Sequence, residues 1–262
     1  MDSVNKTLYI PLYGKSYVSR KGIILKDTKA EEIWDREGFP LKGKSKSKYL
    51  AYYMGMRSAV FDRWTKEQIL SYPDAVVLHI GCGMDNRVGR VAAEDTLWYD
   101  VDFPEVIQQR KRHYTETEIY KMLSADARDP AWLKTVPGDR AIVILEGLSM
   151  YLKPEELENL LRALHDRFAS VHLLMDCYTT FAAKASKYKN PINDVGVTQV
   201  YGLDDPKALE KAGLGFVQEQ DMTPEDMICQ LQGLEQTLFR KLYAGKTARK
   251  LYRMYEFSAG NP

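Results

Sequence analysis

Five short apolar runs alternate with amphipathic segments between residues 73 and 177, a pattern typical of a parallel β-sheet with helices packed on it. The predicted strands are residues 75–80, 97–102, 120–123, 141–145 and 171–175. A strand that is apolar on both faces is buried on both sides, so helices must cover both faces of the sheet. The pattern therefore predicts an α/β fold.

Two longer segments carry apolar side chains at helical spacing. Residues 154–168 begin with a proline and continue with a stripe of leucines, which predicts a helix. Residues 48–64 form a second, aromatic-rich stripe, and Arg57 lies within it, four residues from both Tyr53 and Phe61. A buried guanidinium needs a partner or a ligand, so Arg57 is a candidate site residue.

Glycines and acidic residues stand where four of the predicted strands end. The first strand runs into Gly81-Cys82-Gly83-Met84-Asp85, the second ends in Asp102, and Asp126 and Glu146 follow the third and fourth. Ligands of open α/β sheets bind outside the carboxyl ends of the strands. Glycine lets the backbone approach a ligand closely, and an acid 21 residues after Gly81 stands where ribose hydroxyls are recognised. The four strand ends together predict a ligand site.

The turn after the first strand favours S-adenosylmethionine over NAD as the ligand. A dinucleotide fingerprint needs a third glycine, and Asn86 occupies that position. Asp85 would repel a pyrophosphate, but it would tolerate a ligand that carries an ammonium and a sulfonium group. S-adenosylmethionine has both, and Asp102 and Asp126 suit its ribose and its adenine amino group. An NAD-linked oxidoreductase is the alternative that this turn leaves open.

Composition and charge exclude several other classes. The chain has 262 residues, with 37 Lys+Arg against 36 Asp+Glu and 45% hydrophobic residues, which suits one large globular domain. A net charge of +1 argues against a general nucleic-acid surface. No apolar run approaches the roughly 18 residues of a membrane helix, and the first residues lack the order of a signal peptide. We therefore expect a cytoplasmic protein without a membrane or nucleic-acid partner.

The cysteines and histidines give no sign of a disulfide scaffold or a metal site. Three cysteines lie far apart without a CxxC spacing, and none of the four histidines has metal-ligand spacing to another His or Cys. Because His113 follows a basic run, we expect it at the surface. We therefore expect no metal.

Basic residues concentrate in the first part of the chain. Residues 1–72 hold 14 Lys and Arg against 8 Asp and Glu, with four lysines in the segment 42–48. The run could attract an anion near a site. The alternative is a solvated loop, which the absence of interleaved aromatic residues favours.

Several segments resemble the leucine carboxyl methyltransferase family. The segment VVLHIGCGMDNRVGRV (76–91) is similar to the GxGxDxR turn of the family, and WYDVDFPEVIQQRK (98–111), SADARDPAWL (124–133) and EGLSMYLKPEEL (146–157) follow in order. TLYIPLYGKSYVSR (7–20) and VYGLDDPKALEKAG (200–213) are similar to the bacterial branch that includes tetracenomycin-type polyketide O-methyltransferases. The resemblance implies a Rossmann-like class I methyltransferase fold, with a seven-stranded, mostly parallel sheet, helices on both faces and an N-terminal helical elaboration.

The resemblance also implies site residues. The cofactor contacts of the family fall on Arg57, Gly81, Asp102, Asp126, Ala127 and Glu146. We add Gly83, the second glycine of the turn, and Lys15, a lysine chosen by its spacing. Tyr151 occupies a position that faces the methyl acceptor in the family, although it could simply cover the end of the sheet. We assign catalytic roles to Arg57, whose planar fork would orient an acceptor oxyanion, and to Tyr151. One departure is His79, where many class I enzymes have an acid.

The expected activity is S-adenosylmethionine-dependent O-methylation of a carboxylate or another acidic oxygen on a small molecule. Residues 1–72 are expected to form a helical elaboration or lid on a methyltransferase core of residues 73–262, within one structural domain. A non-catalytic, methyltransferase-like binding module is a further alternative, and the presence of Arg57, Asp102 and Glu146 argues against it.

Overall fold

Seven strands form the centre of the protein. They are β1 (Val76–Ile80), β2 (Trp98–Asp102), β3 (Tyr120–Ser124), β4 (Arg140–Leu145), β5 (Ser170–Tyr178), β6 (Gly215–Gln220) and β7 (Tyr252–Ala259). The computed structural model describes residues 8–37, 41, 43–91, 93, 95–186 and 199–260. In these residues the sheet order is β3-β2-β1-β4-β5-β7-β6, with β1 to β5 parallel and β7 antiparallel to both of its neighbours. The predicted seven-stranded, mostly parallel sheet is confirmed.

Helices pack on both faces of this sheet. The α-helices are α2 (Tyr9–Arg20), α3 (Thr28–Glu37), α4 (Lys48–Ser71), α5 (Arg87–Val91), α6 (Pro104–Arg110), α7 (Pro154–Arg167), α8 (Thr180–Ala185), α9 (Glu225–Ile228), α10 (Gly233–Tyr243) and α11 (Gly245–Arg249). Four short 3-10 helices are η1 (Gly43–Lys46), η2 (Pro130–Thr135), η3 (Ser149–Tyr151) and η5 (Pro206–Ala212).

The alternation of side chains along β4 divides the core into two layers. Ile142 and Ile144 pack on the face that α4 covers, while Val143 and Leu145 pack on the opposite face with the leucine stripe of α7. Side chains of a strand point to opposite faces in turn, so a continuous apolar run supplies both layers. This is the arrangement that the apolar runs predicted.

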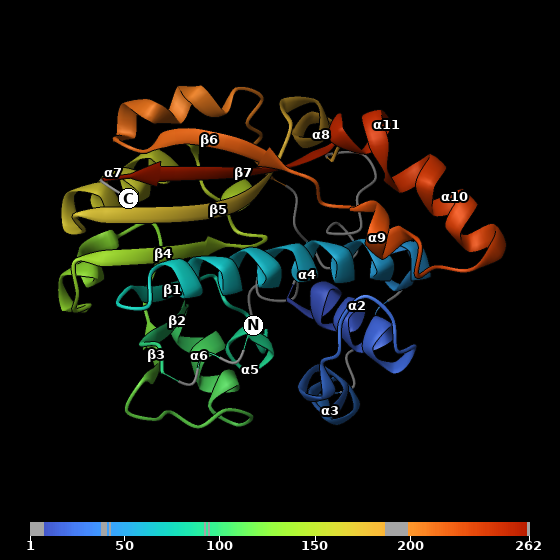
Figure 1. The fold of residues 1–262 in the computed structure, drawn as a ribbon, viewed down its shortest axis with the longest axis horizontal. Coiled ribbons are helices and arrows are strands. Elements are labelled where there is room, and N and C mark those ends of the chain that lie inside the picture. Colours follow the sequence, from blue (N-terminus) through green and yellow to red (C-terminus); the bar gives the residue numbers. More distant parts are fainter. Residues whose placement is uncertain are drawn as a thin grey trace.

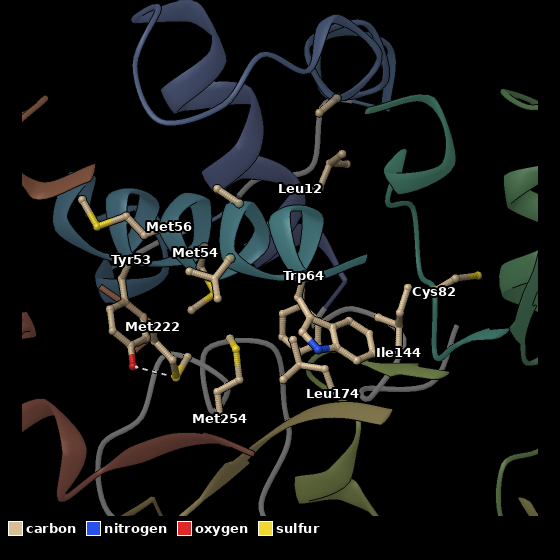
Figure 2. Close-up of a cluster of buried hydrophobic side chains, with 14 of the residues drawn as sticks. Leu12, Tyr53, Met54, Met56, Trp64, Cys82, Ile144, Leu174, Met222 and Met254 are labelled. Carbon is tan, nitrogen blue, oxygen red and sulfur yellow. Dashed lines mark hydrogen bonds between the residues drawn. The ribbon is translucent and has the colours of Figure 1, made fainter. Parts of the chain in front are cut away.

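Helix α4 connects the sheet to the N-terminal helices. Figure 2 shows Trp64 of α4 beside Ile144 and Leu174 of the sheet, while Tyr53, about three turns earlier on α4, points towards Met222. Helix α2 packs along α4, with Leu12 in the same buried cluster. The division of the chain at residue 72 stays a prediction, and this cluster contains residues from both sides of it.

The carboxyl ends of the central strands face a group of helices. Figure 1 shows α2, α8, α10 and α11 gathered on the right, at the end of the sheet where β4 and β5 end. In the described part of the chain, no helix combines the length and the apolar character that crossing a bilayer requires.

Candidate functional site

A cavity of about 720 Å³ lies at the carboxyl ends of β1, β2 and β4. Its volume falls within the range of about 300–1,000 Å³ that small-molecule sites occupy. The glycine turn after β1, Asp102 and Glu146 line one part, and residues of α2, α4, α8, α10 and β7 line the rest. The strand ends that the sequence singled out therefore meet at one site, with the exception of the end of β3.

The turn after β1 depends on its two glycines. Gly81 has φ of +72° and Gly83 has φ of +52°, the left-handed region that side chains with a Cβ rarely adopt. A Cβ on Gly81 would also lie 3.1 Å from the Leu148 side chain. The turn therefore presents bare backbone to the cavity.

Asp102 holds this turn in place. Its carboxylate accepts hydrogen bonds from the backbone N–H groups of Gly83 and Phe103, both at 2.8 Å. Burial raises the pKa of Asp102, and these two hydrogen bonds partly oppose the rise. Each carboxylate oxygen still has acceptor capacity towards the cavity, which suits the hydroxyl groups of a ribose.

Asp100, two residues before Asp102 on β2, is buried and contacts side chains of the protein interior. It pairs with the buried guanidinium of Arg110 and accepts hydrogen bonds from Trp98 Nε1 at 2.9 Å and Tyr120 Oη at 2.6 Å. Arg110 also donates to the carbonyl oxygen of Gly83 at 3.0 Å. The ion pair of Asp100 and Arg110 therefore supports the glycine turn from the protein interior, while Asp102 lines the cavity.

Arg57 is buried at the centre of the site, as its place in the aromatic stripe predicted. Its Nε donates to Glu146 at 3.0 Å, and its Nη1 donates to Asp176 and to Tyr252 Oη, each at 3.0 Å. Tyr252 in turn donates to Asp176 at 2.6 Å. Burial alone would lower the pKa of Arg57, but Tyr252, Asp176 and Glu146 raise it well above its ordinary value, so this guanidinium stays charged.

A second group of ion pairs lies next to Arg57. Glu146 also pairs with the buried Arg87, and Asp85 lies 3.2 Å from Lys15 Nζ, 3.0 Å from Arg87 Nη2 and 2.6 Å from Arg90 Nη1. Burial opposes ionisation of Asp85, but Arg90, Lys15 and Arg87 hold its pKa well below the usual range. Lys15 comes from α2, so the N-terminal helices contribute directly to the site.

Tyrosines surround the part of the cavity away from the glycine turn. Tyr178 and Tyr252 pack edge to face with ring centroids 4.9 Å apart, and Tyr53 lies 6.2 Å from both Tyr252 and Tyr243. All four line the cavity, as does Tyr151. Such a wall is suited to flat, apolar ligand surfaces.

The structure does not bring every expected residue into the cavity lining. Lys15, Arg57, Gly81, Gly83, Asp102, Glu146 and Tyr151 line it, whereas Asp126 and Ala127 do not. Asp126 forms a bidentate pair with Arg128, with contacts of 2.6 to 3.0 Å, and this pairing lowers its pKa. A role for Asp126 and Ala127 in cofactor binding stays a prediction.

Several residues of the site, both charged and uncharged, were not identified from the sequence. Arg87 is the arginine of the GxGxDxR turn, and Asp176 stands at the end of a predicted strand, so the strand-end rule could have found it. Tyr252 lies on β7, which the apolar pattern did not predict. His113, expected at the surface, is buried and lies 2.8 Å from Glu37.

Comparison with known sequences agrees with this geometry. A family model described as leucine carboxyl methyltransferase matches residues 11–165. The tetracenomycin polyketide synthesis O-methyltransferase TcmP of Streptomyces glaucescens is 30% identical over 240 residues, which cover 90% of this chain and 89% of TcmP. The S-adenosyl-L-methionine-dependent methyltransferase dpfgK of Gibberella zeae is 29% identical over 183 residues, or 64% of this chain and 61% of dpfgK.

Solved structures share the fold at low sequence identity. A DUF574 family protein from Streptomyces avermitilis superimposes with a TM-score of 0.58 at 14% identity, over 95% of this chain and 97% of that one. Magnesium protoporphyrin IX methyltransferase from Synechocystis, solved with bound S-adenosylmethionine, gives a TM-score of 0.51 at 11% identity, over 99% of this chain and 98% of that one. The fold is therefore that of class I methyltransferases.

Proposed function

The chain belongs to the leucine carboxyl methyltransferase family, and from this premise we propose that it transfers the methyl group of S-adenosylmethionine to an acidic oxygen of a small molecule. One observation carries the proposal. A single cavity joins the glycine turn, Asp102 and Glu146 to a wall of tyrosines, so a cofactor and an aromatic or apolar acceptor can meet within it.

The charges of the inner cavity fit this cofactor. Three carboxylates, Asp85, Asp102 and Glu146, and two cations, Lys15 and Arg57, line its inner part, while a third cation, Lys44, lines the mouth. S-adenosylmethionine carries an ammonium and a sulfonium against one carboxylate, so its single net positive charge complements the lining. NAD, with two phosphates, would add negative charge to an inner lining that already holds three carboxylates against two cations. The charge balance therefore supports the methyl donor over NAD.

Each part of the cofactor has a candidate partner. The exposed backbone of Gly81 and Gly83 would admit it closely, and Asp102 would accept hydrogen bonds from its ribose hydroxyls. Lys15 and Arg57 would hold its carboxylate. Asp126 and Ala127, just outside the lining, are proposed to contact the adenine.

The protein needs to supply little chemistry for the transfer. When bound, the sulfonium of the cofactor supplies an already activated methyl group. A carboxylic acid acceptor is ionised at pH 7 and needs no general base. Arg57 and Tyr151 are proposed to orient the acceptor oxygen, and the buried cavity excludes water from it. Because Glu146 and Asp176 fix two edges of Arg57, the guanidinium is already positioned before ligands bind.

The cavity wall and a relative together support a proposal for the class of acceptor. TcmP is named as an O-methyltransferase of polyketide synthesis, and the tyrosine wall of this chain suits a flat polyketide-like molecule. We propose a cytoplasmic enzyme that acts on such a compound without a nucleic-acid or membrane partner. A non-catalytic module that only binds the cofactor is the second candidate.

Two experiments test this function. Calorimetry with S-adenosylmethionine, S-adenosylhomocysteine and NAD should give heat for the first two ligands only. Incubation of the protein and labelled S-adenosylmethionine with cell extract should then label a small molecule. Binding of S-adenosylmethionine without any labelled product would favour the non-catalytic module, whereas binding of NAD alone would refute the assignment.

A further inference from the structure

The cavity extends along one face of α4. Leu50, Tyr53, Met54 and Arg57 all line it, and their spacing of three and four residues places them on the same side of the helix. A helix rises about 1.5 Å per residue, so the seven steps from Leu50 to Arg57 span about 10 Å. The cavity is therefore long enough for a molecule of several fused or linked rings beside the cofactor.

The open end of this cavity lies near the start of α4. Residues that are both exposed and part of the lining indicate the mouth, and they include Lys44, Ala185, Leu242 and Leu251. Lys44 belongs to η1, which directly precedes α4. Arg57 marks the buried end, where it is 4% exposed. The cavity thus has a cation at each end and an apolar, aromatic stretch between them.

The two cations differ in their partners. Arg57 is held by Glu146 and Asp176, as described above. Among the residues that the structure describes, no carboxylate forms an ion pair with Lys44, although nearby Lys48 lies 2.7 Å from Glu235. Lys44 is therefore a cationic residue of the cavity lining without an ion pair in the described part of the protein.

We propose that Lys44 binds an anionic group of the acceptor, at the end remote from the oxygen that is methylated. The acceptor is then an elongated aromatic anion whose rings lie against Tyr53 and Met54, with its reactive oxygen near Arg57. This assignment rests on the proposed function and adds a specificity-determining residue to it. It also gives a role to the lysine-rich run, because Lys44, a member of that run, lines the cavity, while Lys42 lies outside the described residues.

A matched pair of fluorescent probes tests this role without knowledge of the natural acceptor. 8-Anilino-1-naphthalenesulfonate and N-phenyl-1-naphthylamine share an aromatic framework, and only the first carries a negative charge. Both are titrated into the full-length protein saturated with S-adenosylhomocysteine, so that the cofactor end is filled. The variants are Lys44→Ala and, as the control, Lys46→Ala, an exposed lysine of the same turn that does not line the cavity.

We expect Lys44→Ala to weaken binding of the sulfonate about three- to five-fold, the upper range for an exposed ion pair, and to leave the neutral probe unchanged. Lys46→Ala should change neither, and added salt should weaken the sulfonate more in the wild type than in Lys44→Ala. Equal effects of the two variants, equal effects on the two probes, or no binding of the sulfonate to the wild type would each overturn the proposal. Calorimetry of S-adenosylhomocysteine on the same samples reports separately on the proposed function.

Discussion

The carboxylate of Asp102 accepts a hydrogen bond from the backbone N–H of Gly83 at 2.8 Å, so the end of β2 and the turn after β1 form one unit. We predict that Asp102→Ala weakens binding of S-adenosylmethionine by about 1.5–3 kcal/mol, because it removes charged hydrogen bonds to the ribose and loosens the turn. Isothermal calorimetry measures this change.

Asp100→Asn is the matched control for Asp102. Asp100 neutralises the buried Arg110, so this substitution should lower the thermal midpoint more than Asp102→Ala does. Its effect on cofactor affinity should be the smaller of the two. If Asp100→Asn weakens cofactor binding more than Asp102→Ala, the assignment of the ribose contact to Asp102 is wrong.

We predict separate effects for two substitutions of Arg57. Arg57→Ala leaves Glu146 and Asp176 without a shared cation and should destabilise the protein by about 3–5 kcal/mol. Arg57→Lys keeps the charge but cannot reach both carboxylates with one planar group, so methyl transfer should fall much further than stability. The measurements are denaturant unfolding and the rate of methyl transfer. A folded Arg57→Lys protein with wild-type turnover and cofactor affinity would reduce Arg57 to a structural residue.

Removal of the Tyr252 hydroxyl should affect turnover more than cofactor binding. In Tyr252→Phe, Asp176 loses a donor at 2.6 Å, and the pKa of Asp176, which burial already raises, should rise further. The ion pair between Asp176 and Arg57 then weakens. We therefore expect the free energy of unfolding to fall by about 1.5–3 kcal/mol and kcat to decrease. Tyr53→Phe is the control, because within the described residues the hydroxyl of Tyr53 donates to the sulfur of Met222, at 3.7 Å, and not to Asp176 (Figure 2). Equal effects of the two substitutions on kcat would contradict a positioning role for Tyr252.

A cluster of polar side chains between α4 and α10 should stabilise the protein near neutral pH and lose this effect in acid. Hydrogen bonds from Lys48 and Tyr52 lower the pKa of Glu235 from 4.5 to about 2. A carboxyl with a depressed pKa in the folded state stabilises the protein fully above its unfolded pKa, and this contribution is lost as the pH falls from about 4.5 to about 2. Glu235→Gln should therefore lower the free energy of unfolding at pH 7. Between about pH 4.5 and pH 2, the free energy of unfolding of the variant should fall less steeply than that of the wild type. Parallel pH profiles for wild type and Glu235→Gln would reject the assignment.

Burial on both faces leaves a largely apolar run, so β1, β4 and β5 could be predicted from the sequence, and β2 and β3 could be predicted although Asp100 and Lys121 interrupt their runs. β6 and β7 could not. Phe216 and Val217 of β6 are partly or largely exposed at the sheet edge, and β7 interleaves Arg253 and Glu256 with aromatic residues, so neither strand has that signature. The family resemblance, and not the pattern, supplied the expectation of seven strands.

The part of the site that lies at the ends of the parallel strands could be predicted from the sequence. Gly81, Asp102 and Glu146 meet because the carboxyl ends of parallel strands share one edge. The partners of Arg57 could not be predicted from the sequence, since Asp176 lies 119 residues away in the chain and Tyr252 lies 195 residues away. A helical stripe shows that a guanidinium is buried, but it does not show which distant acid neutralises it.

The position of β7 between β5 and β6 has a consequence for biosynthesis. In the described sheet, β6 has β7 as its single neighbour, yet it leaves the ribosome first. Until β7 follows, β6 has no partner strand, the edge of β5 is open, and Arg57 lacks the hydroxyl of Tyr252. The nascent protein should therefore be unable to transfer a methyl group until β7 has been made, because both the sheet and the partners of Arg57 depend on this strand.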